Sequence, residues 1–106
     1  MKPKIKIIYS MYYFKEVIEP MLEFTQKNKN FNFDTYPVAG SFEIPFLINR
    51  NLATYESFIA LGCIIKGKNI NHEAISTAIF TNLQRISIEN NMPIGNGIFN
   101  ANNISL

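Results

Sequence analysis

The segment that most restricts the fold is Ser57–Ile65 (SFIALGCII), which is apolar at nearly every position. A strand with one face in water alternates between apolar and polar residues, and this segment does not. Uninterrupted apolar strands are typical of the centre of a parallel sheet, where helices cover both faces. We therefore predict a buried central strand within an α/β fold.

The segments on either side alternate between the patterns of strands and helices. In the last helix, apolar residues recur at helical spacing and form one stripe: Ile75, Ile79, Leu83 and Ile86. The expected elements besides the central strand are the strands Lys4–Ser10, Phe31–Tyr36 and Pro93–Phe99 and the helices Phe14–Asn28, Glu43–Leu52 and Asn71–Asn90. This order predicts a four-stranded, mostly parallel sheet with helices on both faces.

Prolines and glycines help to place the boundaries of these elements. The run from Pro37 to Gly40 predicts a turn after the second strand. Pro45 is compatible with the first turn of a helix. Pro20 either kinks the first helix or marks a later start for it.

Ligands of parallel α/β sheets bind outside the carboxyl ends of the strands. The segments that directly follow the expected strands are therefore the candidates for a functional site. These segments are Ser10–Tyr13, Ala39–Glu43, Lys66–His72 and Gly95–Phe99.

Composition limits the class of protein. The chain has 106 residues, of which 47% are hydrophobic, so it can bury the core of one domain, residues 1–106. The formal net charge is +2 and the lysines are scattered, so we expect no nucleic-acid binding. A single cysteine, Cys63, fits a reducing cytoplasm. The apolar runs are far shorter than a membrane span and the start does not resemble a signal peptide, so we expect a mature, cytoplasmic protein.

Three blocks of sequence resemble the lumazine synthase family. VAGSFEIP at Val38–Pro45 is similar to the family's V-P-G-A/S-F-E-I-P turn, and ALGCIIKG at Ala60–Gly67 is similar to its A-L-G-C-V-I-R-G strand end. PIGNGI at Pro93–Ile98 is similar to its P-V-x-F/N-G-V/I strand. The order of the blocks and the distances between them also agree with the family.

The resemblance implies a transferase of riboflavin biosynthesis with a flavodoxin-like three-layer sandwich fold. Its reaction joins 5-amino-6-(D-ribitylamino)uracil to 3,4-dihydroxy-2-butanone 4-phosphate and gives 6,7-dimethyl-8-ribityllumazine. It implies small-molecule substrates, no metal or redox cofactor, and a homo-oligomer, a pentamer or larger, with sites shared between subunits. Family chains continue through two further helices that carry a phosphate-binding Arg, so we expect a C-terminally incomplete member; Arg50 and Arg85 do not match that Arg.

The resemblance also assigns substrate-binding positions. An aromatic that stacks on the pyrimidine falls at Tyr12, or at Tyr13 if the nearby insertion is placed differently. The other substrate-binding residues are Ser41, Phe42, Glu43, Cys63, Ile64, Ile65 and Asn96, and the phosphate loop contains Gly67, Lys68 and Asn69. The residues alone allow a structural alternative, in which Ser41 is a helix N-cap and Glu43 favours the helix dipole.

The catalytic position differs from the family pattern. Family members have a His four residues after the loop glycine, in G-x-x-x-H-F-E, and here Asn71 stands in that place. His72, the only histidine, occupies the next position and Glu73 matches the acidic one. Either His72 acts as the general acid or base from this neighbouring position, or it is a half-exposed polar residue without a catalytic role.

Three functions therefore remain open. The first is an active lumazine synthase with a displaced His. The second is a non-catalytic relative that binds the ribityl-pyrimidine or assembles with a partner. The third is an unrelated flavodoxin-like binding module, against which the three ordered blocks argue.

Overall fold

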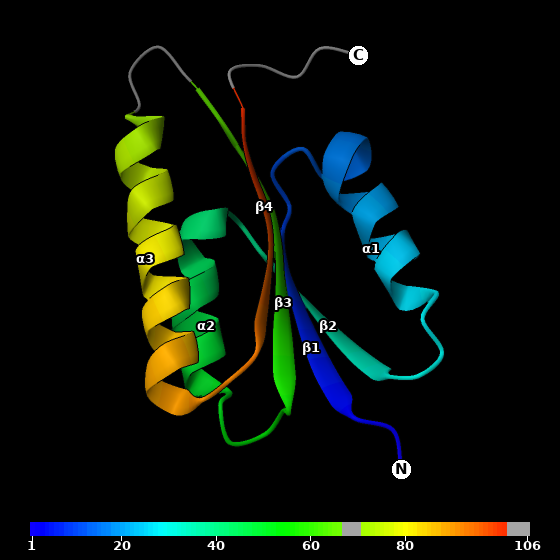
Figure 1. The fold of residues 1–106 in the computed structure, drawn as a ribbon. Coiled ribbons are helices and arrows are strands. Elements are labelled where there is room, and N and C mark those ends of the chain that lie inside the picture. The colour runs from blue at the N-terminus through cyan, green and yellow to red at the C-terminus, as the bar shows by residue number, and fades with distance from the viewer. Residues whose placement is uncertain (67–70, 102–106) are drawn as a thin grey trace.

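The computed structural model describes residues 1–66 and 71–101, in which four parallel strands form one sheet between helices (Figure 1). The order of the strands across the sheet is β2-β1-β3-β4. Their bounds are β1 Lys4–Ser10, β2 Asn32–Val38, β3 Ser57–Ile65 and β4 Ile94–Ala101. The expected α/β fold with a four-stranded parallel sheet is thus confirmed, and the strand order is that of flavodoxin-like folds.

The two central strands are the most buried. In β1, Ile7 and Ile8 are completely buried although they point to opposite faces, and β3 is buried over most of its length. Burial on both faces explains why β3 lacks alternation in its sequence. The predicted bounds of β1 and β3 are both confirmed.

The second strand differs from its prediction. It begins at Asn32 instead of Phe31 and continues through Pro37 and Val38, which we had assigned to a turn. A proline cannot donate a hydrogen bond to a sheet, but β2 is an edge strand and needs bonds on one side only. The fourth strand is likewise one residue later at its start and longer at its end than predicted, running from Ile94 to Ala101.

Each predicted helix is present, with shifted bounds. The first is divided into a π-helical turn, η1 (Phe14–Ile18), and α1 (Glu19–Gln26). Pro20 lies in the first turn of α1, so it marks the later start that we considered. The second consists of a 3-10 turn, η2 (Ser41–Glu43), and α2 (Ile44–Arg50), and the third, α3, spans His72–Asn90.

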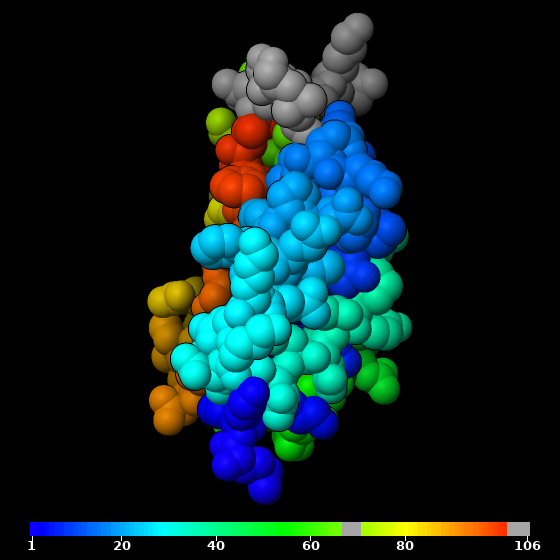
Figure 2. Space-filling view, turned by 90° about the vertical axis from the view of Figure 1, so that its right-hand side faces the viewer, coloured from blue at the N-terminus to red at the C-terminus, as the bar shows by residue number. Residues whose placement is uncertain are grey.

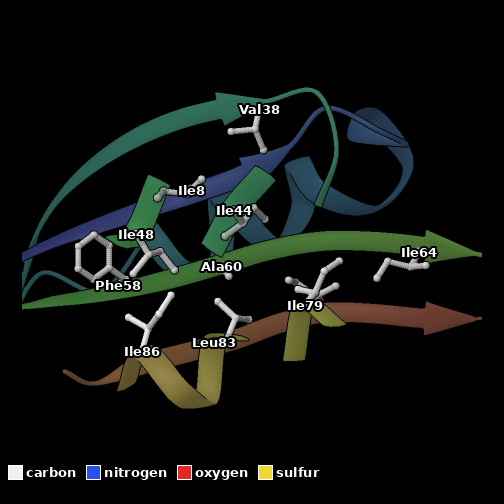
Figure 3. Close-up of a cluster of buried hydrophobic side chains, with 11 residues drawn as sticks. Ile8, Val38, Ile44, Ile48, Phe58, Ala60, Ile64, Ile79, Leu83 and Ile86 are labelled. Carbon is white, nitrogen blue, oxygen red and sulfur yellow. The ribbon is translucent and has the colours of Figure 1, made fainter. Parts of the chain in front are cut away.

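The helices form two layers around the sheet. Helices α2 and α3 cover one face and α1 covers the other (Figure 1). Figure 3 shows the larger core, in which side chains of α2 and α3 point toward those of the sheet. The buried members of this core are Ile8, Val38, Ile44, Ile48, Phe58, Ala60, Ile64, Ile79, Leu83, Ile86 and Ile98. The smaller core under α1 contains Ile7, Ile18, Leu61 and Cys63.

On the α1 side, the first half of strand β4 carries no side chains, because its residues there are glycines. Gly95 and Gly97 lie beside Ile59 and Leu61 of β3, and Phe99 is 53% exposed. Figure 2 shows this face: α1 occupies the middle, and part of β4 remains visible beside it. None of the helices in the described ranges 1–66 and 71–101 has both the length and the apolar character needed to cross a membrane.

Candidate functional site

The carboxyl edge of the sheet brings together most of the segments that the sequence singles out. The turn η2 after β2 contacts both β3 and α3, and β3 also contacts η1. The strand order reverses between β1 and β3, because the chain passes from β1 to one neighbour and later returns to the other side. Such a reversal leaves a crevice outside the carboxyl ends of the two strands, where α/β proteins bind ligands.

The loop after β1 distinguishes between the two tyrosines. Ser10 is completely buried, and its Oγ accepts a hydrogen bond of 3.0 Å from the Tyr12 backbone N–H. Tyr13 has a φ of 55°, a left-handed conformation, and its side chain packs against the core under α1. Tyr12 is 51% exposed, and its ring meets that of Tyr13 edge-on at 4.6 Å. Of the two, Tyr12 has the ring that remains available to a ligand.

The turn η2 buries a hydroxyl group. Ser41 is only 7% exposed, and among residues 1–66 and 71–101 its Oγ finds no hydrogen-bond partner. Gly40, not Ser41, is the residue that precedes the turn, and no side chain caps it, so the alternative role of Ser41 as an N-cap is wrong. Phe42 and Glu43 are exposed beside it. An unpaired buried hydroxyl is costly in a folded chain and therefore rare, and a functional role is one of the reasons for which such a group is retained.

The end of β3 contributes mainly apolar surface. Ile64 belongs to the core under α2 and α3, whereas Cys63 belongs to the core under α1, so their side chains point to opposite faces. Burial, and to a smaller extent the nearby Glu16 carboxylate, raise the pKa of the Cys63 thiol. The thiol therefore stays protonated at neutral pH, which does not favour a role for Cys63 as a nucleophile. Ile65 is half-buried at the strand end.

The residues Asn71 and His72 have different places at the start of α3. Asn71 is the N-cap, and its side-chain oxygen accepts a hydrogen bond of 3.0 Å from the Ala74 N–H. His72 is the first helical residue and is half-buried. Its backbone carbonyl accepts a hydrogen bond from the Ser76 hydroxyl at 2.7 Å. The imidazole is therefore attached to a well-anchored turn, while the Asn71 amide oxygen is already engaged.

One of the predicted site residues, Asn96, lies apart from this edge. Asn96 pairs with Ala60 in the first half of β4, and its side-chain oxygen accepts a hydrogen bond from the Ile98 N–H at 3.0 Å. Within this chain it is not brought to the carboxyl edge. The predicted phosphate loop, Gly67, Lys68 and Asn69, lies outside the described residues.

Two residues at the edge were given no role from the sequence: Ser10, which holds the Tyr12 backbone, and Gly62, against which Ser41 packs. The family-like block ALGCIIKG contains Gly62 and could have drawn attention to it. A groove of about 330 Å³ runs between α2 and α3, and of the predicted residues it contains only Phe42. In the described ranges, no three His, Cys, Asp or Glu side chains are grouped so that they could hold a metal ion.

The fold and the edge together define a flavodoxin-like α/β protein, whose candidate small-molecule site lies at the topological switch point. The family model for 6,7-dimethyl-8-ribityllumazine synthase matches residues 2–105, which is nearly the whole chain. The chain therefore belongs to the 6,7-dimethyl-8-ribityllumazine synthase family, and the resemblance seen in its sequence is confirmed.

Relatives that carry this family name come from several bacteria. A 6,7-dimethyl-8-ribityllumazine synthase of Buchnera aphidicola subsp. Baizongia pistaciae is 37% identical over 111 residues, covering 97% of this chain and 70% of the relative. One from Blochmanniella pennsylvanica is 41% identical over 80 residues, covering 73% and 50%. One from Limosilactobacillus reuteri is 32% identical over 92 residues, covering 85% and 60%. The chain thus spans 50% to 70% of the length of these relatives.

Proposed function

We propose that this chain catalyses the reaction for which its family is named, the formation of 6,7-dimethyl-8-ribityllumazine in riboflavin biosynthesis. The substrates are 5-amino-6-(D-ribitylamino)uracil and 3,4-dihydroxy-2-butanone 4-phosphate. The proposal is supported by the family model, which matches nearly the whole chain, and by the turn η2 with Ser41, which contacts both β3 and the helix α3 that begins with His72. We propose further that residues 1–106 act as one domain.

The ribityl-pyrimidine binds where the loop after β1 approaches η2. The exposed ring of Tyr12 offers a face on which the planar pyrimidine stacks. The Glu43 carboxylate accepts hydrogen bonds from ribityl hydroxyls, and the Ser41 hydroxyl contributes a further bond. Phe42 and the strand end of Cys63, Ile64 and Ile65 supply the apolar wall of the pocket.

The phosphate of the second substrate binds at the loop before α3. Gly67, Lys68 and Asn69 precede the N-terminus of a helix of 19 residues. Free backbone N–H groups and the helix dipole favour an anion at such a place, and the Lys68 ammonium adds a positive charge. In our proposal Asn96 contacts substrate only across a subunit boundary, since its own chain places it away from the edge.

His72 transfers the protons. The amine of the ribityl-pyrimidine attacks the ketone, and the carbonyl oxygen leaves as water when the imine forms. Elimination then releases phosphate. The ring closes when the ribitylamino nitrogen attacks the remaining carbonyl group, whose oxygen leaves as a second water. The imidazole of His72 can take and return protons in these steps, whereas the amide of Asn71 does not titrate and is engaged in capping α3.

We also propose that the protein works in the cytoplasm as a homo-oligomer, a pentamer or larger. The α1 side carries exposed apolar side chains, since Phe24 is 77% and Phe99 is 53% exposed. Such side chains are typical of a surface that another subunit covers, which supports the proposal. Small molecules are its ligands, and no metal or redox cofactor takes part.

The test is the appearance of the lumazine chromophore when the folded protein meets both substrates, compared with the uncatalysed mixture. We expect a rate above background that falls at least about a hundredfold in His72→Ala, the size of a general acid–base contribution. Gln84→Ala, an exposed change further along α3, is the matched control and should keep the rate. A wild-type rate equal to background would exclude the enzyme.

A second candidate function rests on Asn71, which stands where the family has its catalytic His. In this case the chain binds the ribityl-pyrimidine without turning it over. Calorimetric binding of that substrate, together with a rate no different from background, would identify this function.

A further inference from the structure

The Ser41 hydroxyl is buried directly against the backbone of β3. Gly62 of β3 lies beneath it, and a side chain built at Gly62 would overlap Ser41 Oγ. The same added carbon would lie 3.2 Å from Ser41 Cβ and 3.4 Å from Ile98 Cγ1 of β4. Gly62 is therefore the position of β3 at which η2 and β4 come together, and it carries no side chain.

The contact is tight enough to determine where the hydroxyl lies. Carbon atoms essentially never approach an oxygen as closely as the overlap at Gly62 would require, so any larger residue must displace Ser41. Since Ser41 opens η2, its displacement also moves the start of the turn that carries Phe42 and Glu43. Gly97, on the opposite face of the sheet, meets Leu61 and has no contact with Ser41.

We propose that Gly62 is a positioning residue for the ribityl-pyrimidine site, acting through Ser41. The absence of a side chain at Gly62 makes the recess in which the hydroxyl sits, fixed and without a partner among residues 1–66 and 71–101. A fixed hydroxyl binds a polar group of the substrate without a further loss of side-chain freedom. This inference rests on the proposed function, because it assumes that the substrate bonds to Ser41.

The experiment is a double-mutant cycle of Gly62→Ala and Ser41→Ala. Binding of 5-amino-6-(D-ribitylamino)uracil is measured by calorimetry, and unfolding is measured in urea without ligand. Gly95→Ala is the matched control, because a carbon added there meets its neighbours only at the ordinary distance of 3.6 Å. The control should bind as the wild type does.

We expect each single variant to weaken binding by about five- to tenfold, as the loss of one hydrogen bond does. The double variant should bind about as well as Ser41→Ala alone, because the overlapping oxygen is gone. The remaining contact with the Cβ at position 41, at 3.2 Å, needs a shift of only a few tenths of an ångström. In urea, adding Ser41→Ala to Gly62→Ala should raise the unfolding midpoint, because it removes the overlapping oxygen.

Losses that multiply in the double variant, to roughly the product of the single losses, would overturn the inference, as would wild-type affinity in Gly62→Ala. If Gly62→Ala does not fold, Gly62→Ala/Ser41→Gly is compared with Ser41→Gly, and unequal affinities would likewise overturn it. A wild-type protein that binds no ribityl-pyrimidine refutes both this inference and the proposed function. One that binds, with independent losses, refutes the inference alone.

Discussion

The N-cap of α3 allows a quantitative prediction about the residue that replaces the family's His. Asn71→Ala removes the side-chain oxygen that accepts a bond of 3.0 Å from the Ala74 N–H and leaves the backbone bond from Ile75 to the Asn71 carbonyl in place. The loss of one cap costs about 1 kcal/mol of unfolding free energy. For a domain of this size, that corresponds to a melting temperature lower by ~4–8 °C.

Urea unfolding followed by circular dichroism measures this loss, because α3 carries the buried Ile79, Leu83 and Ile86 and should unfold with the whole domain. Asn71→Asp is the matched variant. It keeps an acceptor oxygen and adds a negative charge beside the helix N-terminus, which is worth ~0.3–1 kcal/mol. We therefore expect Asn71→Asp to be at least as stable as the wild type, and both proteins to be more stable than Asn71→Ala.

The same two variants separate capping from catalysis. If Asn71 only holds the first turn on which His72 is placed, Asn71→Asp should keep the lumazine-forming rate, whereas Asn71→Ala should lower it by loosening that turn. An Asn71→Ala protein as stable as the wild type, within about 0.3 kcal/mol, would refute the capping argument. A rate lost in Asn71→Asp at unchanged stability would show that the amide itself takes part in the reaction.

Three further predictions concern the sheet and its surroundings. Gly97→Ala places a carbon 2.8 Å from Leu61 Cδ2 and should lower the unfolding free energy by ~1–3 kcal/mol, while Gly95→Ala should stay within about 0.5 kcal/mol in the same urea titration. Phe58→Ala empties a site that is 1% exposed and should cost ~3–5 kcal/mol. The hydrogen bond from Tyr55 to Asp34 raises the Tyr55 pKa above its ordinary value of 10.0, so its stabilisation is present below that pH and is lost above it. Between about pH 8 and pH 11, the wild type should therefore lose more stability than Tyr55→Phe.

The central part of the fold could be predicted from the sequence because its buried strands consist mainly of apolar residues. The bounds of β1 and β3 match the apolar segments Lys4–Ser10 and Ser57–Ile65. The start of α3 was predicted within one residue, and the difference is Asn71, which caps the helix and does not belong to it. An N-cap residue differs from the first helical residue in its backbone angles. The spacing of apolar residues in the sequence does not report those angles, so it cannot separate the two.

Prolines caused the larger errors at the edges of the fold. Pro37 was taken as part of a turn, although it extends β2, because the sequence does not reveal that β2 lies at the edge of the sheet. Pro20 left open whether the first helix is kinked or begins later. The structure shows a π-helical turn before α1, which Tyr13 precedes with a left-handed backbone conformation. Neither the π-helical turn nor this conformation of Tyr13 is indicated by the local sequence.

The site was predictable as a set of segments and not as a set of contacts. The rule that ligands bind at the carboxyl ends of parallel strands located the turns that carry Tyr12, Ser41 and His72. It could not show that the Ser41 hydroxyl is buried against Gly62, nor that the Ser10 hydroxyl holds the Tyr12 backbone. Both contacts join residues whose placement depends on how the turns pack onto the completed sheet.

The strand order has a consequence for how quickly this chain can fold. Every strand is parallel to its neighbours, so no two of them can pair through a short hairpin, and each pairing must wait for an intervening helical crossover. Strand β1 is synthesised first, yet the residue opposite Ile5 in β3 is Ser57, nearly half of the 106-residue chain later. Closing such a long loop reduces the entropy of the chain before the burial of apolar side chains between the strands can offset the loss. We therefore expect the pairing of β1 with β3 to limit the folding rate. Until then, the isoleucines of β1 remain in water and are open to association with other unfinished chains.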